Sequence, residues 1–111
     1  MTHHTDLILP ISQLQFDGGN TARATAANWD VIQTGALLQH VIRTHTSREL
    51  DGGKPLAVSV TFDVSDPAID GDEVVFESRI DRRTRTLVFA SGTAAQGARH
   101  LLKATVVFRI A

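Results

Sequence analysis

The 111-residue sequence contains no cysteine, and this absence removes several kinds of chemistry at once. Disulfide bonds, thiolate metal ligands and a cysteine nucleophile are all excluded. No apolar run is long enough to span a bilayer, and the N-terminus lacks the basic start and apolar stretch of a signal peptide. We therefore expect a cytoplasmic protein.

The sequence also has almost no excess charge of either sign. Its formal net charge is −1, with 11 Lys and Arg residues against 12 Asp and Glu residues. Proteins that bind nucleic acid or an anionic membrane through bulk charge carry a clear positive excess, so we expect neither partner. No set of metal ligands can be placed, and we expect neither a metal nor another cofactor.

The remaining composition is typical of one globular domain. Apolar residues make up 42% of the chain and charged residues 21%. A chain of this length can bury a single hydrophobic core. Because there are no internal repeats and no low-complexity linker, we predict one domain over residues 1–111.

One long helix is predicted over residues 31–47. Its apolar residues recur at helical spacing and form a stripe more than about 100° wide, which indicates a helix buried on most sides. They are Val31, Ile32, Gly35, Leu37, Leu38, Val41 and Ile42. Asn28 or Asp30 can serve as the N-cap. The helix itself has no Asp or Glu between Val31 and Ser47.

Strands are predicted on both sides of this helix. Leu7–Phe16 predicts a first strand, with Pro10 indicating an edge or a bulge. Residues 21–27 are small and polar with no clear period, so we expect a loop there. After the helix, alternation with period two predicts four strands over residues 56–64, 74–81, 87–95 and 102–110. Arg82 and Arg83 are predicted to form a tight exposed turn.

A helix followed by a four-strand meander resembles the hotdog fold. The resemblance covers nearly the whole chain and is carried by Lys54–Phe62, Pro67, Gly71–Val74 and Gly97–Phe108, which are similar in pattern to hotdog acyl-CoA thioesterases. It implies an α+β protein in which an antiparallel sheet of about five strands wraps one long central helix.

The resemblance also implies where a ligand binds. In this family the acyl-thioester pocket lies between two subunits near the helix N-terminus, which implies a homodimer or a higher homo-oligomer. Free amides there can polarise a thioester carbonyl. The segment Gln33-Thr34-Gly35 corresponds to the family's His-Gly-Gly signature, with Gly35 matching. Asn28, Gln33, Thr34 and Gly35 are therefore the expected substrate-binding residues.

Three residues are candidates for activating water or attacking the thioester, because the helix lacks the carboxylate that this family uses. Asp17 follows Phe16 and partly matches a Phe-x-Asp-x-Asp pattern of the family. Asp30 lies just before the helix, and His40 has an ordinary pKa near neutrality. Each also has a structural interpretation: a turn residue for Asp17, an N-cap for Asp30 and a partly buried structural histidine for His40.

Four arginines cluster around the third turn: Arg79, Arg82, Arg83 and Arg85. Such a cluster is commonly a solvated hairpin end. Because arginine binds phosphate through two hydrogen bonds, Arg82 and Arg83 are also candidates for the phosphates of coenzyme A or of a carrier-protein arm.

The leading prediction is a thioesterase-like hydrolase that hydrolyses or binds an acyl thioester, either acyl-CoA or acyl-carrier protein. One alternative is a non-catalytic hotdog module that binds an acyl group or assembles with a partner. Another is a hotdog lyase or isomerase that uses His40 with a carboxylate for proton transfer.

Overall fold

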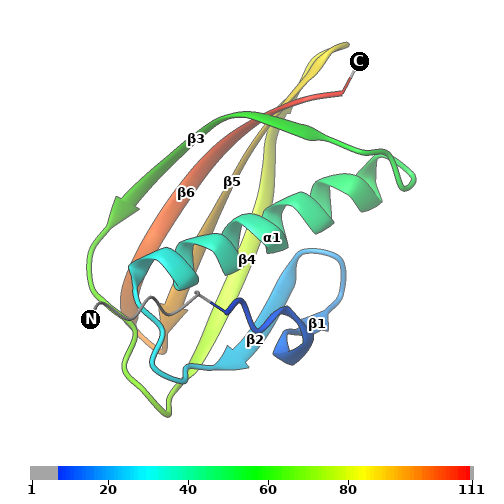
Figure 1. Ribbon diagram of the computed structural model, residues 1–111. Coiled ribbons are helices and arrows are strands. Elements are labelled where there is room, and N and C mark those ends of the chain that lie inside the picture. The colour runs from blue at the N-terminus through cyan, green and yellow to red at the C-terminus, as the bar shows by residue number, and fades with distance from the viewer. Residues whose placement is uncertain (1–7, 111) are drawn as a thin grey trace, which may run out of the picture.

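The computed structural model describes residues 8–110, which form a curved antiparallel sheet with one helix on its concave face (Figure 1). The helix is α1 (Val31–Glu49). The other elements are η1 (Ile11–Gln13), β1 (Gln15–Asp17), β2 (Thr21–Thr25), β3 (Leu56–Val64), β4 (Glu73–Arg83), β5 (Leu87–Gln96) and β6 (Arg99–Arg109). Within the described range, no helix is both long enough and apolar enough to cross a membrane.

The sheet has the strand order β1-β2-β4-β5-β6-β3. Strands β4, β5 and β6 follow one another as hairpins. β3 pairs with β6, the last strand, so the segment that follows α1 forms one edge of the sheet. Figure 1 shows β3 arching along this edge beside α1. The fold thus leaves two edges, β1 and β3.

The core lies between α1 and the central strands β4, β5 and β6. Leu37, Leu38, Val41 and Ile42 of α1 are fully buried there. Gly92 allows the close approach of the helix, because a Cβ atom at this position would lie only 2.8 Å from Ile42 Cδ1. The same atom would lie 2.7 Å from the carbonyl oxygen of Glu77.

The predicted α+β hotdog arrangement is confirmed, with six strands where about five were expected. The additional strand is β2, a segment whose sequence pattern predicts a loop. Ala22 and Ala24 are buried on one face of β2, and Thr21, Arg23 and Thr25 lie on the other. Alanine gives a weak apolar signal, and it is pairing with β4 that fixes this segment as a strand.

Two other local predictions need correction. Residues 8–14 do not form a strand: η1 occupies Ile11–Gln13, and β1 begins only at Gln15, while Leu7 lies outside the described residues. Arg82 and Arg83 are not a turn, because β4 continues through Arg83. The chain turns at residues 84–86, where the Thr84 amide donates to the Leu87 carbonyl oxygen at 2.8 Å.

The apolar residues of β3 were expected to form one face, but the structure leaves them partly open to solvent. Their exposed fractions lie between 37% and 53% for Leu56, Val58, Val60, Phe62 and Val64. A bulge between Ala57 and Ser59 shifts the register, so that Leu56 pairs with Arg109 and faces away from Val60. In the described chain nothing covers this edge.

Candidate functional site

The first turn of α1 is closed by a capping box. Asp30 is the N-cap, and its Oδ1 atom accepts a hydrogen bond from the Gln33 amide at 2.8 Å. In return, the Gln33 Oε1 atom accepts from the Asp30 amide at 3.1 Å. These two bonds satisfy two of the free amides at the start of the helix and fix where it begins.

The side chains of Gln33 and Thr34 also serve this helix start. Gln33 Nε2 donates to the Ile8 carbonyl oxygen at 3.0 Å and ties the N-terminal segment to α1. The Thr34 amide and hydroxyl both donate to the Asp30 carbonyl oxygen, at 3.0 and 2.9 Å. The polar groups of Gln33 and Thr34 that were expected to meet a ligand are thus engaged within the protein.

Two amides at this helix end remain available. Within residues 8–110, the backbone amides of Val31 and Ile32 donate to no protein acceptor. Both residues are exposed, Ile32 by 64%. Because the start of a helix carries partial positive charge, these two amides can donate hydrogen bonds to a carbonyl oxygen or an oxyanion. Gly35 lies one turn further on, beneath the ring of Phe62.

Asn28 lies beside the helix start in a left-handed backbone conformation, with φ of 58°. Its amide donates to Asp70 Oδ1 at 2.8 Å. Two backbone hydrogen bonds hold the same loop beside this contact. The Gly71 amide donates to the Ala26 carbonyl oxygen, and the Ala26 amide donates to the Asp72 carbonyl oxygen. Asp70 therefore joins the site. The sequence pattern predicts only a connection at Asp70, and the Asp70-Gly71-Asp72 turn gives no sign of a contact 42 residues away.

Asp17 lies far from this site. Its carboxylate pairs with Arg23 at 3.3 Å, and the neighbouring Phe16 ring lies under Arg48, near the C-terminal end of α1. The helix has 19 residues and a length of about 28 Å, so Asp17 and Asp30 lie near opposite ends of it. One chain therefore does not bring these two predicted carboxylates together.

His40 lies about 15 Å along the helix from Asp30, at 1.5 Å per residue. It is partly buried. Burial lowers the pKa of His40 from its ordinary value of 6.5, and the nearby positive charge of Arg43 lowers it further. The imidazole is therefore neutral at pH 7 and able to accept a proton.

The two arginines predicted to bind phosphate face opposite sides of the sheet. A bulge between Ile80 and Arg82 places Arg82 opposite Phe89 and Arg83 opposite Val88. Arg82 lies over the Phe89 ring, 5.8 Å from its centre, on the face away from α1. Val88 is fully buried under the helix, so Arg83 lies on the helix side.

A further polar contact fastens the end of α1 to the sheet. His45 Nδ1 lies 2.9 Å from Ser78 Oγ, and His45 Nε2 lies 3.6 Å from Glu49 Oε1. This order of serine, imidazole and carboxylate is that of a hydrolytic triad. Ser78 is only 3% exposed, however, so its hydroxyl is closed to a substrate. The contact is structural.

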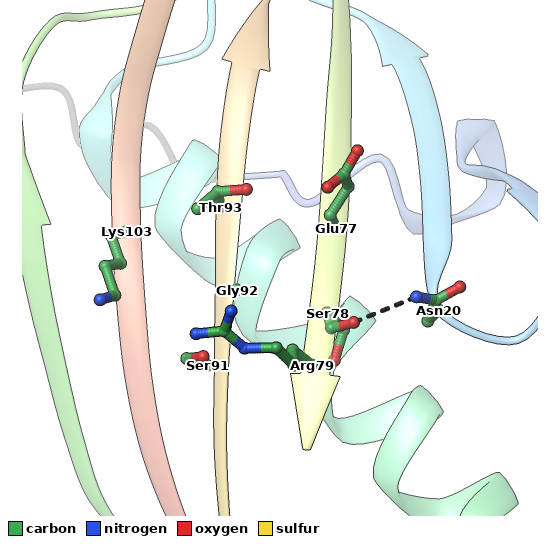
Figure 2. Close-up of a pocket in the computed structure, with 8 residues that line it drawn as sticks. All are labelled: Asn20, Glu77, Ser78, Arg79, Ser91, Gly92, Thr93 and Lys103. Carbon is green, nitrogen blue, oxygen red and sulfur yellow. Dashed lines mark hydrogen bonds between the residues drawn. The ribbon is translucent and has the colours of Figure 1, made fainter. Parts of the chain in front are cut away.

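The face of the sheet away from α1 carries a shallow depression of about 360 Å³ (Figure 2). Glu77, Thr93 and Lys103 form a row across β4, β5 and β6, with Arg79 and Ser91 beside it. Arg79 is paired with Asp81 at 2.7 Å. The row combines charges of both signs. Because it lies on the face of the sheet opposite to the helix, it is separate from the site at the helix start.

Comparison with known proteins shows the fold of this chain. No protein-family model matches the sequence, and no curated protein matches it either. Solved structures do match. Zebra fish thioesterase superfamily member 2 is 11% identical, with a TM-score of 0.77 over 88% of this chain and 80% of its own.

Two further matches hold ligands. A Bacillus halodurans protein crystallised with CoA is 15% identical, with a TM-score of 0.74 over 87% of this chain and 70% of its own. A Streptococcus mutans protein bound to acetyl-CoA is 12% identical, with a TM-score of 0.66 over 89% of this chain and 87% of its own. The chain thus has the hotdog fold of thioesterase-superfamily structures, as its sequence pattern predicted.

Proposed function

We propose that this protein binds an acyl thioester at the first turn of α1 and hydrolyses it, in a pocket formed between two copies of the chain. The observation that carries the proposal is the pair of amides at Val31 and Ile32, which donate to no acceptor within residues 8–110. Proteins of the same fold that hold CoA and acetyl-CoA support a thioester as the ligand class.

In this proposal the two amides bind the thioester oxygen and stabilise the oxyanion that forms when water attacks. Asp30 is the candidate for activating that water, because His40 of the same chain lies about 15 Å further along the helix. Asp30 uses Oδ1 for the cap and keeps its second carboxylate oxygen for a water. Asp17 takes no part, because it lies on β1, at the sheet edge opposite to β3.

The second copy is proposed to pair along β3. This edge strand has nine residues and presents a row of partly exposed apolar side chains together with unpaired backbone groups. Exposed edges of this kind readily add another strand, and antiparallel pairing of β3 with itself makes a closed two-fold dimer. Because Phe62 of β3 lies against Gly35, the interface adjoins the start of α1.

A proline at Val31 tests the proposed oxyanion site. Proline fits the first helical position, and the extended ψ of −178° at Asp30 suits a residue that precedes proline. Val31→Pro therefore removes one amide hydrogen and keeps the helix. We expect kcat on acyl-CoA substrates to fall about 10²-fold, while Val31→Ala, which keeps the amide, stays near wild type. Equal activity of both variants would overturn the assignment.

The water-activating residue is tested on the same substrates. Asp30→Asn keeps a similar shape and removes the base, so it should lower kcat by about 10² or more. Asp17→Asn is the matched control and should hydrolyse acyl-CoA at the wild-type rate. Loss of activity only in Asp17→Asn would contradict the proposed site.

The proposed dimer is tested by a charge placed on the apolar seam. Val60→Lys should shift the protein towards monomer in sedimentation equilibrium at micromolar concentration, because it buries a charge in the interface. Thr61→Lys adds the same charge on the opposite face of β3 and should remain dimeric. A monomeric wild-type protein would refute the dimer.

The second candidate function is a non-catalytic module that binds an acyl thioester. One observation favours it: Glu49, at the last position of α1, is the only carboxylate in the helix. Saturable binding of acyl-CoA without turnover would select the module over the enzyme. A lyase or isomerase would instead exchange a substrate proton with solvent in a reaction that depends on His40.

A further inference from the structure

Gln96, the last residue of β5, has a polar side chain in the interior of the protein, with an exposed fraction of 8%. Its Oε1 atom accepts a hydrogen bond from the Ile69 amide at 2.8 Å. Its Nε2 atom donates to the carbonyl oxygens of Ile69, at 2.8 Å, and of Asp72, at 3.3 Å. Both donor hydrogens of the side chain and its oxygen are therefore engaged by one loop, residues 65–72 between β3 and β4.

The bonds between Gln96 and Ile69 reproduce the pairing of two antiparallel strands. In such a ladder, two opposite residues exchange hydrogen bonds, each donating to and accepting from the other. Gln96 makes this exchange with Ile69 through its side chain instead of its backbone. Because a buried amide group that loses its partners costs free energy, the side chain and the loop hold each other in one position.

The same loop holds the segment that leads from β2 into α1, and Figure 1 shows the two side by side. The Asp72 carbonyl oxygen, which Gln96 contacts, also accepts from the Ala26 amide at 3.0 Å. Asp70 Oδ1 accepts from the Asn28 amide at 2.8 Å. A continuous series of hydrogen bonds therefore runs from Gln96 through the loop to Asn28, two residues before the N-cap of α1.

The backbone of Asn28 needs this support. Its φ of 58° is a left-handed conformation that is unfavourable for most residues with a Cβ atom. The next residue, Trp29, is 5% exposed, and its ring centre lies 6.2 Å from that of Phe76 in the core. Asn28 is thus held by the loop through Asp70 and by the core through Trp29. These two attachments set the direction in which the chain enters α1.

Arg99 holds the other half of the loop and provides a comparison. It lies opposite Gln96 across the β5–β6 turn. Its Nη1 atom donates to the Pro67 carbonyl oxygen at 2.9 Å, and its Nη2 atom lies 3.6 Å from Asp66 Oδ1. Within residues 8–110, no hydrogen bond joins Asp66 or Pro67 to the segment before α1. Of these two side chains, only Gln96 is therefore connected to the helix start.

We propose that Gln96 is a positioning residue for the start of α1. By fixing residues 69–72 it fixes Asn28, and through Asn28 it fixes the direction of the Val31 and Ile32 amides. Donors aimed at a developing oxyanion act only when they are held in place, so the position of this segment matters for catalysis. That consequence rests on the proposed function, whereas the position of the helix start rests on these hydrogen bonds alone.

Amide hydrogen exchange, followed by NMR, tests the positioning role. Gln96→Met keeps the length of the side chain and removes its three hydrogen bonds. The Ile69 and Asn28 amides should then exchange at least about tenfold faster, because the loop opens more readily. Arg99→Ala should leave Asn28 exchange within about twofold of wild type. Acceleration equal to that of the buried Val106 amide, which reports global unfolding, would reduce Gln96 to general stability and overturn the proposal.

A second variant tests the last contact of the series and does not depend on a substitution in the interior. Asp70 is exposed, so Asp70→Ala should fold normally and release only the Asn28 amide. We expect faster exchange at Asn28 and wild-type exchange at Ile69. Acrylamide quenching of Trp29, the only tryptophan, should rise at least about twofold in Gln96→Met and in Asp70→Ala. Unchanged Asn28 exchange and unchanged quenching in Asp70→Ala would overturn the proposal.

Steady-state kinetics on acyl-CoA substrates separate the role of Gln96 from the proposed function. A displaced helix start loses oxyanion stabilisation rather than substrate binding, so Gln96→Met should lower kcat about tenfold and change KM less than about threefold. Arg99→Ala should turn over at the wild-type rate. If wild-type protein hydrolyses no acyl-CoA, the proposed function fails, and exchange at Asn28 still decides the position of the helix start. Full kcat in Gln96→Met, with fast exchange at Asn28, would overturn the link to catalysis.

Discussion

The ring of Phe62 on β3 packs against Gly35 in α1, and a Cβ atom at Gly35 would lie 3.2 Å from Phe62 Cε1. This contact joins the exposed sheet edge to the beginning of the helix, where the two free amides lie. Phe62 is 39% exposed, so its ring has room to shift. The contact therefore connects β3 to the start of α1 and leaves the Phe62 ring able to move.

Alanine at the two buried glycines should have different consequences. Gly92→Ala places a Cβ atom against the Glu77 carbonyl oxygen and Ile42, neither of which can move freely, and should lower the free energy of unfolding by about 1–3 kcal/mol. Gly35→Ala displaces only the Phe62 ring and gains helix propensity, so we expect a change within about 1 kcal/mol. Urea unfolding of both variants measures this, and equal losses would contradict the difference in packing.

Two substitutions separate the capping role of Asp30 from its proposed catalytic role. Asp30→Ala should lower the free energy of unfolding by about 1 kcal/mol because the cap is lost. Asp30→Asn keeps a capping oxygen and should unfold like wild type, yet it cannot act as a base. If Asp30→Asn retains full hydrolytic activity, Asp30 is a structural cap alone.

The lowered pKa of His40 predicts a specific dependence of stability on pH. The folded protein binds a proton at His40 less readily than the unfolded chain does, so the free energy of unfolding falls as the pH drops below about 6.5. Above that pH His40 is neutral in both states and contributes no slope. His40→Gln should remove this part of the acid destabilisation. Urea unfolding at about pH 5 to 8 tests it, with the exposed His100→Gln as the comparison; parallel profiles for wild type and His40→Gln would refute it.

A substitution at Thr46 should stabilise the protein. Its side chain is fully buried, and within the described residues its Oγ1 atom has no hydrogen-bond partner. Thr46→Val keeps the shape and removes the unsatisfied hydroxyl, so the free energy of unfolding should rise by about 1 kcal/mol. Thermal unfolding provides the measurement. A lower melting temperature would show that the hydroxyl has a partner in solution.

Much of the fold followed from the sequence because its patterns are local. Apolar spacing predicts a helix over residues 31–47, and the structure extends it to Glu49; Asp30 is one of the two N-caps that the sequence predicts. The alternation in residues 56–64 correctly predicted a strand. β2 was missed because Ala22 and Ala24 mark a buried face only weakly, and pairing with β4 decides their structure.

The candidate site was less predictable, because it depends on contacts between distant segments. Gly35, Asp30 and Asn28 were expected near the helix start and lie there, whereas the contact of Asp70 with Asn28 could not be foreseen. The roles that the sequence predicts for Asp30 and His40 in catalysis, and for Arg82 and Arg83 in phosphate binding, stay predictions.

The sequence by itself determined one long capped helix and a run of alternating strands, since hydrophobic period and capping chemistry act over a few residues. Only the tertiary structure decided which polar groups are free. The polar groups of Gln33 and Thr34 are engaged at the helix start, and the bulge before Arg82 decides that Arg83, and not Arg82, faces the helix. It also left β3 at an edge, because strand order depends on pairing across the chain.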